Sequence, residues 1–274
     1  MKSIKHYLGF SYYIWLFLFV FLPIALLLYQ SLFIDGHFTL QNYVQFFSSK
    51  TYLVMTANSI YYAFLITLFT LIVSYPTAYF LTKLKHKQLW LMLIILPTWI
   101  NLLLKVYAFM GIFSRHGLVN QWLQFFNISN QQLLFTTWSF IFVAVYIQIP
   151  FMILPIFNSL EEIPTEYEVA SSDLGANRWQ TIYKVIIPLS IPGVKAGVQA
   201  VFIPSLSLFM LTRLIGGNKV ITLGTAVEEH FLTTQNWQMG STIGVILIIT
   251  MIVLMIFTKE RKQGGKDEIK KNNS

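Results

Sequence analysis

The stretch EYEVASSDLGANRWQTIYKVIIPLSIPG, residues 166–193, is a polar interruption in an otherwise apolar chain. It holds three acids, one Arg and one Lys, a glycine at position 175 and prolines at positions 188 and 192. Hydrophobic runs flank it on both sides. A loop that only joined two helices would need neither these charges nor these turn residues. The segment is therefore expected to have a function of its own.

The composition is that of an integral membrane protein. The 274 residues are 55% hydrophobic and 16% aromatic but only 11% charged, with a mean hydropathy of +0.62. A soluble domain carries about 25% charged residues, so this chain could not cover a water-facing surface. The absence of cysteine excludes disulfides and thiolate sites. The formal charge of +8 does not indicate a nucleic-acid partner, because the basic residues cluster beside hydrophobic runs.

Six hydrophobic runs predict an all-α fold with six transmembrane helices, since about 20 apolar residues cross the hydrocarbon core. These spans lie at about 10–29, 54–82, 89–113, 133–157, 193–212 and 239–257. Residues 1–258 would form the membrane domain and 259–274 a charged cytoplasmic tail. The first run exceeds the length of a signal-peptide core and lacks a cleavage site, so we expect it to stay as a span.

The distribution of Lys and Arg predicts the orientation, because these residues favour cytoplasmic loops. With the N-terminus inside, 14 of the 19 basic residues fall on the inner side and 5 on the outer side. Both termini, and the polar segment 161–188 between the fourth and fifth spans, are therefore expected in the cytoplasm.

The polar segment is predicted to form two short helices. A helix over 165–174 can start after Pro164 and end at Gly175, which suits a left-handed cap. Asn177 is a good N-cap with Gln180 three residues later, as in a capping box. The second helix is expected to end near Pro188.

Each short helix has an apolar stripe, formed by Tyr167, Ala170 and Leu174 in the first and by Trp179, Ile182 and Ile186 in the second. An alternative interpretation is a hairpin that only rests on lipid headgroups.

The spacing of these signals resembles the EAA loop of ABC-importer permeases. Val169-Ala170-Ser171 is followed after three residues by Gly175, and after nine more by Val185-Ile186-Ile187-Pro188. Val169 departs from the usual glutamate, and Glu168 precedes it. The resemblance implies the type I, MetI-like permease fold, with a cytoplasmic coupling loop that docks on an ATPase subunit. The coupling residues it implies are Glu166, Glu168, Val169, Ala170, Ser171, Asp173, Gly175, Arg178, Trp179 and Pro188.

Two further stretches resemble spermidine/putrescine permeases of the B type. They are Leu96–Asn101 with Lys105-Val106-Tyr107, and Pro204–Phe209 with Leu214–Gly217 and Phe231-Leu232. The resemblance implies a C-type second permease subunit, a dimer of ATP-binding subunits and an extracellular polyamine-binding protein, in a bacterial inner membrane. It also implies that this chain binds no cofactor and that ATP-Mg lies on the partner.

A polyamine requires acceptors and aromatic faces. The candidates for the substrate path or for docking of the binding protein are Trp99, Asn101, Tyr107, Glu228 and Glu229. The aromatic residues could equally belong to a lipid belt, and the two glutamates to a solvated loop. Lys105, inside a predicted span, is expected to reach the outer interface or a partner subunit. No acid lies within the predicted spans, so the chain is not expected to hold a tight cation site of its own.

Three other functions were considered. A permease for another solute, such as thiamine, iron, sulfate or molybdate, is the nearest alternative. An ion-coupled secondary transporter would want acids or histidines along its spans. A membrane enzyme would need a set of catalytic residues. The sequence contains no phosphate-binding loop of the type found in proteins that hydrolyse ATP. The chain is therefore expected to be a non-catalytic subunit.

Overall fold

The computed structural model describes residues 12–34, 36–217 and 219–258. The elements in chain order are η1 (Phe17–Phe21), α2 (Leu22–Leu32), β1 (Phe33–Ile34), β2 (His37–Phe38), α3 (Gln41–Ser48), α4 (Lys50–Thr82), α5 (Lys87–Ile95), η2 (Leu96–Trp99), α6 (Leu102–Phe113), α7 (Leu118–Phe125), α8 (Thr137–Glu161), α9 (Glu166–Asp173), α10 (Arg178–Thr181), η3 (Ile182–Ile186), α11 (Ile187–Ser205), α12 (Phe209–Leu214), α13 (Leu223–Glu228), η4 (Glu229–Thr233) and α14 (Trp237–Thr258). Within these residues, six helical stretches are long and apolar enough to cross a membrane. The predicted all-α architecture with six candidate spans is confirmed, while the predicted tail lies outside the described residues.

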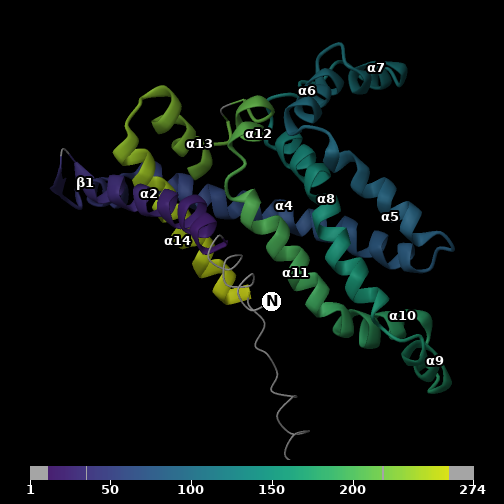
Figure 1. The fold of residues 1–274 in the computed structure, drawn as a ribbon. Coiled ribbons are helices and arrows are strands. Elements are labelled where there is room, and N and C mark those ends of the chain that lie inside the picture. The colour runs from purple at the N-terminus through teal and green to yellow at the C-terminus, as the bar shows by residue number, and fades with distance from the viewer. Residues whose placement is uncertain (1–11, 35, 218, 259–274) are drawn as a thin grey trace, which may run out of the picture.

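The core forms where α4, α8 and α11 pack against one another. Of the six candidate spans, the one in α8 has the largest buried share, 61% of its most apolar window. Figure 1 shows α8 and α11 side by side, with α4 crossing them and extending toward the pair formed by α2 and α14. The first span has no buried residue in its window. Helix α14 instead contributes Met239, Ile243 and Ile246 to a second, smaller cluster of buried residues with α3 and α13, so the first span is the one with the most exposed sides among the six candidates.

Two glycines allow α11 to approach α8 closely. A Cβ at Gly193 would lie 2.6 Å from the carbonyl oxygen of Pro155, and one at Gly197 would lie 2.7 Å from the sulfur of Met152. Small residues four apart are the usual means by which membrane helices bring their backbones together. The spacing Gly193-x-x-x-Gly197 is a local signal for this close approach.

The fifth span differs from the prediction. The helix runs without a break from Arg178 to Ser205, through Pro188 and Pro192, so it neither ends near Pro188 nor restarts at 193. The preceding turn is a π-helix in which the Ile187 N–H donates to the carbonyl of Ile182. A proline normally clashes with the carbonyl four residues earlier, and the wider π turn removes that clash.

The third span also differs from the single helix predicted at 89–113. Its chain is broken at η2, where Pro97 lacks an N–H, and it restarts at α6. Length and hydropathy alone would place this span at Leu102–Phe125. However, Figure 1 shows α5 running along α8 and α7 turning away beyond α6. We therefore assign the third crossing to α5 and α6 together, with α7 outside it.

Candidate coupling surface and outer loops

The polar segment between α8 and α11 has the predicted local structure. Helix α9 is followed by Gly175 at a φ of +83°, the left-handed conformation that favours glycine. The Asn177 side chain accepts from the Gln180 N–H at 2.9 Å, and the Gln180 side chain accepts from the Asn177 N–H at 2.9 Å. This is the predicted capping box, and it starts α10 directly after the corner.

A buried hydrogen bond holds the two short helices together. The hydroxyls of Ser171 on α9 and Thr181 on α10 lie 2.9 Å apart, and both residues are buried. Separating the two helices would cost the buried Ser171 hydroxyl its bond to Thr181, whereas the Thr181 hydroxyl also donates to the Asn177 carbonyl at 3.3 Å. The α9–α10 hairpin is therefore a stiff unit, continuous with the fifth span at its end.

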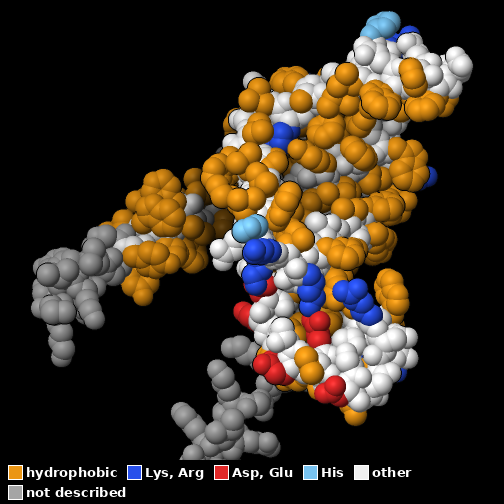
Figure 2. All heavy atoms as spheres, turned by 90° about the vertical axis from the view of Figure 1, so that its right-hand side faces the viewer, with side chains coloured by type: hydrophobic (Ala, Val, Ile, Leu, Met, Phe, Trp, Pro, Cys, Tyr) orange, Lys and Arg blue, Asp and Glu red, His pale blue; other side chains and the backbone are white. Residues whose placement is uncertain are grey.

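Two ion pairs connect this region to the turn between α4 and α5. Lys83 Nζ lies 2.5 Å from Glu168 Oε1, and Lys87 Nζ lies 2.6 Å from Glu161 Oε2. Figure 2 shows the charged side chains gathered on the lower part of this face, below a broad hydrophobic surface. The four side chains are 30–39% exposed, so each pair contributes at most about 1 kcal/mol.

The role of these pairs is therefore mainly positional. Lys83 and Glu168 are 85 residues apart in the chain, and Lys87 and Glu161 are 74 apart. No local sequence pattern identifies the partners of these lysines. The Lys83–Glu168 pair joins the end of α4 to α9, and the Lys87–Glu161 pair joins the start of α5 to the end of α8.

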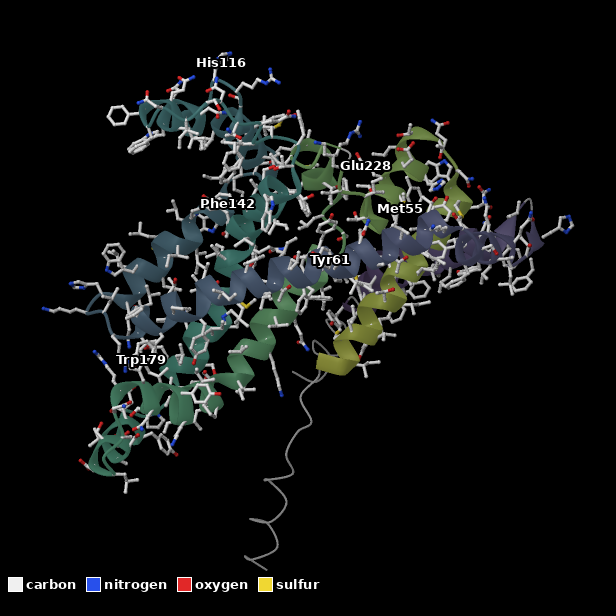
Figure 3. All side chains as sticks on the ribbon, turned by 180° about the vertical axis from the view of Figure 1, so that it is seen from behind. Met55, Tyr61, His116, Phe142, Trp179 and Glu228 are labelled. Atoms are coloured by element: carbon white, nitrogen blue, oxygen red, sulfur yellow. The ribbon has the colours of Figure 1, made fainter. Side chains whose placement is uncertain are left out.

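The hairpin presents apolar side chains to the surroundings. Leu174 is 89% exposed and Trp179 is 79% exposed. Figure 3 shows Trp179 at the end of the molecule formed by α9 and α10. The predicted stripe of the second helix is wrong in one respect, because Ile186 is only 2% exposed and belongs to the core. Exposed apolar groups on a stiff hairpin are suited to binding another protein.

The other predicted coupling residues divide between the surface and internal contacts. Glu168 is engaged by Lys83, and Ser171 by Thr181. Val169, at the position where the family usually has glutamate, is exposed. The surface residues of the set are Glu166, Val169, Ala170, Asp173 and Arg178.

The predicted substrate-path residues on the third span are not equivalent. Trp99 is 76% exposed and Tyr107 is 55% exposed. Asn101 instead caps α6, because its side-chain oxygen accepts from the Leu103 N–H at 2.8 Å. No hydrogen bond or ion pair among the described residues joins Trp99 or Tyr107 to the outer glutamates.

The two adjacent glutamates, Glu228 and Glu229, have different surroundings. Glu228 forms an ion pair with Arg213 at 2.7 Å, and its side chain is only 13% exposed. Glu229 lines a pocket of about 570 Å³ together with Tyr52, His230 and residues of α3 and α13. The pair therefore does not act as one acidic patch, because the charge of Glu228 is already balanced.

His230, in η4, connects this segment to the start of α4. Its Nε2 lies 2.8 Å from the Tyr52 hydroxyl, and its Nδ1 lies 3.3 Å from the Thr234 hydroxyl. Burial lowers the pKa of His230, and the nearby Glu229 carboxylate acts in the opposite direction. A neutral imidazole, able to donate from one nitrogen and accept at the other, fits this position. The contact spans 178 residues, and no sequence signal indicated it.

A hairpin between the fourth and fifth of six spans, with exposed apolar side chains, is the arrangement implied by the resemblance to importer permeases. The model of the family of binding-protein-dependent transport system inner membrane components matches residues 5–259. The chain belongs to this family, whose members are the membrane-embedded permeases of ABC importers.

Comparison with known proteins gives a consistent result. The chain is 34% identical over 253 residues to the spermidine/putrescine transport system permease protein PotB of Escherichia coli, covering 88% of this chain and 92% of the relative. A bacterial ABC transporter that imports the polysaccharide alginate contains a similar fold, with a TM-score of 0.81, 18% identity and 94% of both chains covered. The MetNI methionine ABC transporter matches with a TM-score of 0.58 and 16% identity, over 77% of this chain and 95% of that one. The type I permease fold is thus confirmed.

Proposed function

We propose that this chain is one of two permease subunits of an ATP-driven polyamine importer in a bacterial inner membrane. The observation that carries the substrate assignment is the 34% identity to PotB over 88% of the chain. The fold by itself does not select a substrate, since the alginate importer shares it. The resemblances around Trp99 and in the outer loop support the same assignment.

The mechanical part of the proposal rests on the α9–α10 hairpin. ATP binding and hydrolysis occur on a separate ATPase dimer, and Leu174 and Trp179 dock on it from the cytoplasmic side. The Ser171–Thr181 hydrogen bond and the continuous helix from Arg178 to Ser205 would let the hairpin pass a rigid-body displacement into the fifth span. The Lys83–Glu168 pair would pass it into α4.

A second permease subunit, of the C type, is expected beside α4, α11 and α14. An apolar groove of about 770 Å³ lies between these helices, lined among others by Tyr61, Phe64 and Phe202. It offers an extended contact surface for a helix of the second subunit. An extracellular polyamine-binding protein would deliver the substrate to the opposite, outer end. Both termini lie in the cytoplasm in this arrangement, as the distribution of Lys and Arg predicts.

Uptake in proteoliposomes tests the proposal. The chain is assembled with its second permease, ATPase and binding protein, and labelled spermidine is supplied outside. We expect uptake that requires ATP and is competed by putrescine but not by thiamine, iron, sulfate or molybdate. Transport of one of those solutes instead would refute the polyamine assignment, and uptake driven by a proton gradient without ATP would refute the ABC mechanism.

A further inference from the structure

Helix α7 carries an apolar face that no other described part of the chain covers. Leu118 is 60% exposed, Trp122 is 68% exposed and Phe125 is 83% exposed. Their i, i+4 and i+7 spacing places them within an arc of about 60° on the helix. All three residues follow the third predicted span, 89–113, in the sequence.

The opposite side of α7 fixes its orientation. Asn120 is fully buried, and its amide donates to the carbonyls of Ser114 at 2.9 Å and Gln131 at 3.1 Å. Its side-chain oxygen accepts from the Gln131 N–H at 2.9 Å. Since these bonds hold the buried side of α7 to its own chain, the apolar face points away from the protein.

The position of α7 is the outer end of the third crossing. In Figure 1 it turns away from the direction of α5 and α6, and Figure 3 shows His116, in the turn before it, at the end of the molecule opposite Trp179. Leu104 and Tyr107 on α6 are 62% and 55% exposed. Exposed apolar side chains thus lie both on α7 and on α6, the adjoining helix assigned to the third crossing.

We infer that α7 lies along the outer membrane–water interface, with Leu118, Trp122 and Phe125 inserted at the boundary of headgroups and acyl chains. Aromatic side chains favour this depth, and an amphipathic helix with one apolar face binds it in the plane of the membrane. Helix α7 contains no charged residue, so it offers little to a charge-complementary protein surface. Arg115, just before it, is placed to contact a lipid phosphate.

The assignment has a mechanical consequence for the third span. A helix anchored in the interface and fixed to the protein through Asn120 would resist vertical movement of α6 during transport. The inference depends on the membrane placement of the chain and not on which solute it carries.

Spin labelling tests this inference, because the chain contains no cysteine and single substitutions can be labelled directly. Phe125→Cys probes the apolar face. Gln124→Cys is the matched control, since Gln124 is the neighbouring exposed residue and donates to the Asn130 side chain at 2.7 Å. Each variant is assembled with its partner subunits in lipid nanodiscs, and collisions of the nitroxide with oxygen and with a water-soluble nickel complex are measured.

We expect the ratio of oxygen to nickel accessibility to be at least severalfold higher at position 125 than at position 124. Equal ratios that indicate water at both positions would overturn the inference. Protection of position 125 from both reagents would also overturn it, because a protein would then cover the face. Spermidine uptake by the wild-type complex is measured separately in proteoliposomes, so absence of uptake with lipid contact at position 125 intact would count against the polyamine assignment alone.

Discussion

Replacement of Gly175 tests whether the corner between α9 and α10 couples the ATPase to the spans. Gly175 has a φ of +83°, and no heavy atom lies within 4 Å of an added Cβ. The cost of a substitution therefore comes from backbone strain and not from collision. An L-residue in this left-handed conformation costs about 1–2 kcal/mol of backbone strain. Asparagine costs less because it tolerates the left-handed region, and a β-branched residue costs more.

We expect the effect to increase in the order Gly175→Asn, Gly175→Ala, Gly175→Val. A strain of about 1–2 kcal/mol lowers the occupancy of the native corner by a factor of about 5–30. The hairpin would then dock less often on the ATPase. The assay measures co-purification of the ATPase, and spermidine taken up per ATP hydrolysed in proteoliposomes. Both quantities should fall along the series.

Gly36→Val provides a matched control, because Gly36 has a φ of +80° and also has open space around a Cβ. It lies in the short β1–β2 hairpin, far along the chain from the coupling segment. We expect similar strain there without a change in transport per ATP. Wild-type assembly and uptake for Gly175→Val would refute the coupling role of the corner. An equal loss of uptake in Gly175→Val and Gly36→Val would show that the substitution at Gly175 acts through general stability and not through coupling.

Three further outcomes are expected. Lys83→Glu and Glu168→Lys should each lower uptake, and the double exchange should restore it. A double-mutant cycle of transport rates measures this, and no restoration in the double variant would show that the pair is not required. Gly193→Val should destabilise the assembled protein by about 1–3 kcal/mol, seen as a lower melting temperature, because the added Cβ would press on the carbonyl of Pro155. Since burial lowers the pKa of His230, the stability contributed by the neutral imidazole is complete above pH about 6.5 and is lost as the pH falls through the lowered pKa. His230→Gln should weaken this pH dependence of the melting temperature, and an unchanged profile would contradict it.

Several features of this protein follow from the sequence because they depend on neighbouring residues. Apolar runs of membrane length predict the six candidate spans. The corner at Gly175 and the capping box at Asn177 are also local, since each involves residues at most a few positions apart. These features were predicted and confirmed. The same local reasoning failed at Pro188, because the π turn that accommodates the proline is not encoded in its immediate spacing.

The tertiary structure alone decided which charges remain available. Glu168 was expected to take part in coupling and Glu228 in the substrate path or in docking of the binding protein, yet each is paired within the chain, with Lys83 and Arg213 respectively. The tertiary structure also revealed the exposed apolar face of α7 and the contact between Tyr52 and His230. The physical reason is that hydropathy and capping act over a few residues, whereas ion pairing and burial depend on which distant segments the packed helices bring together.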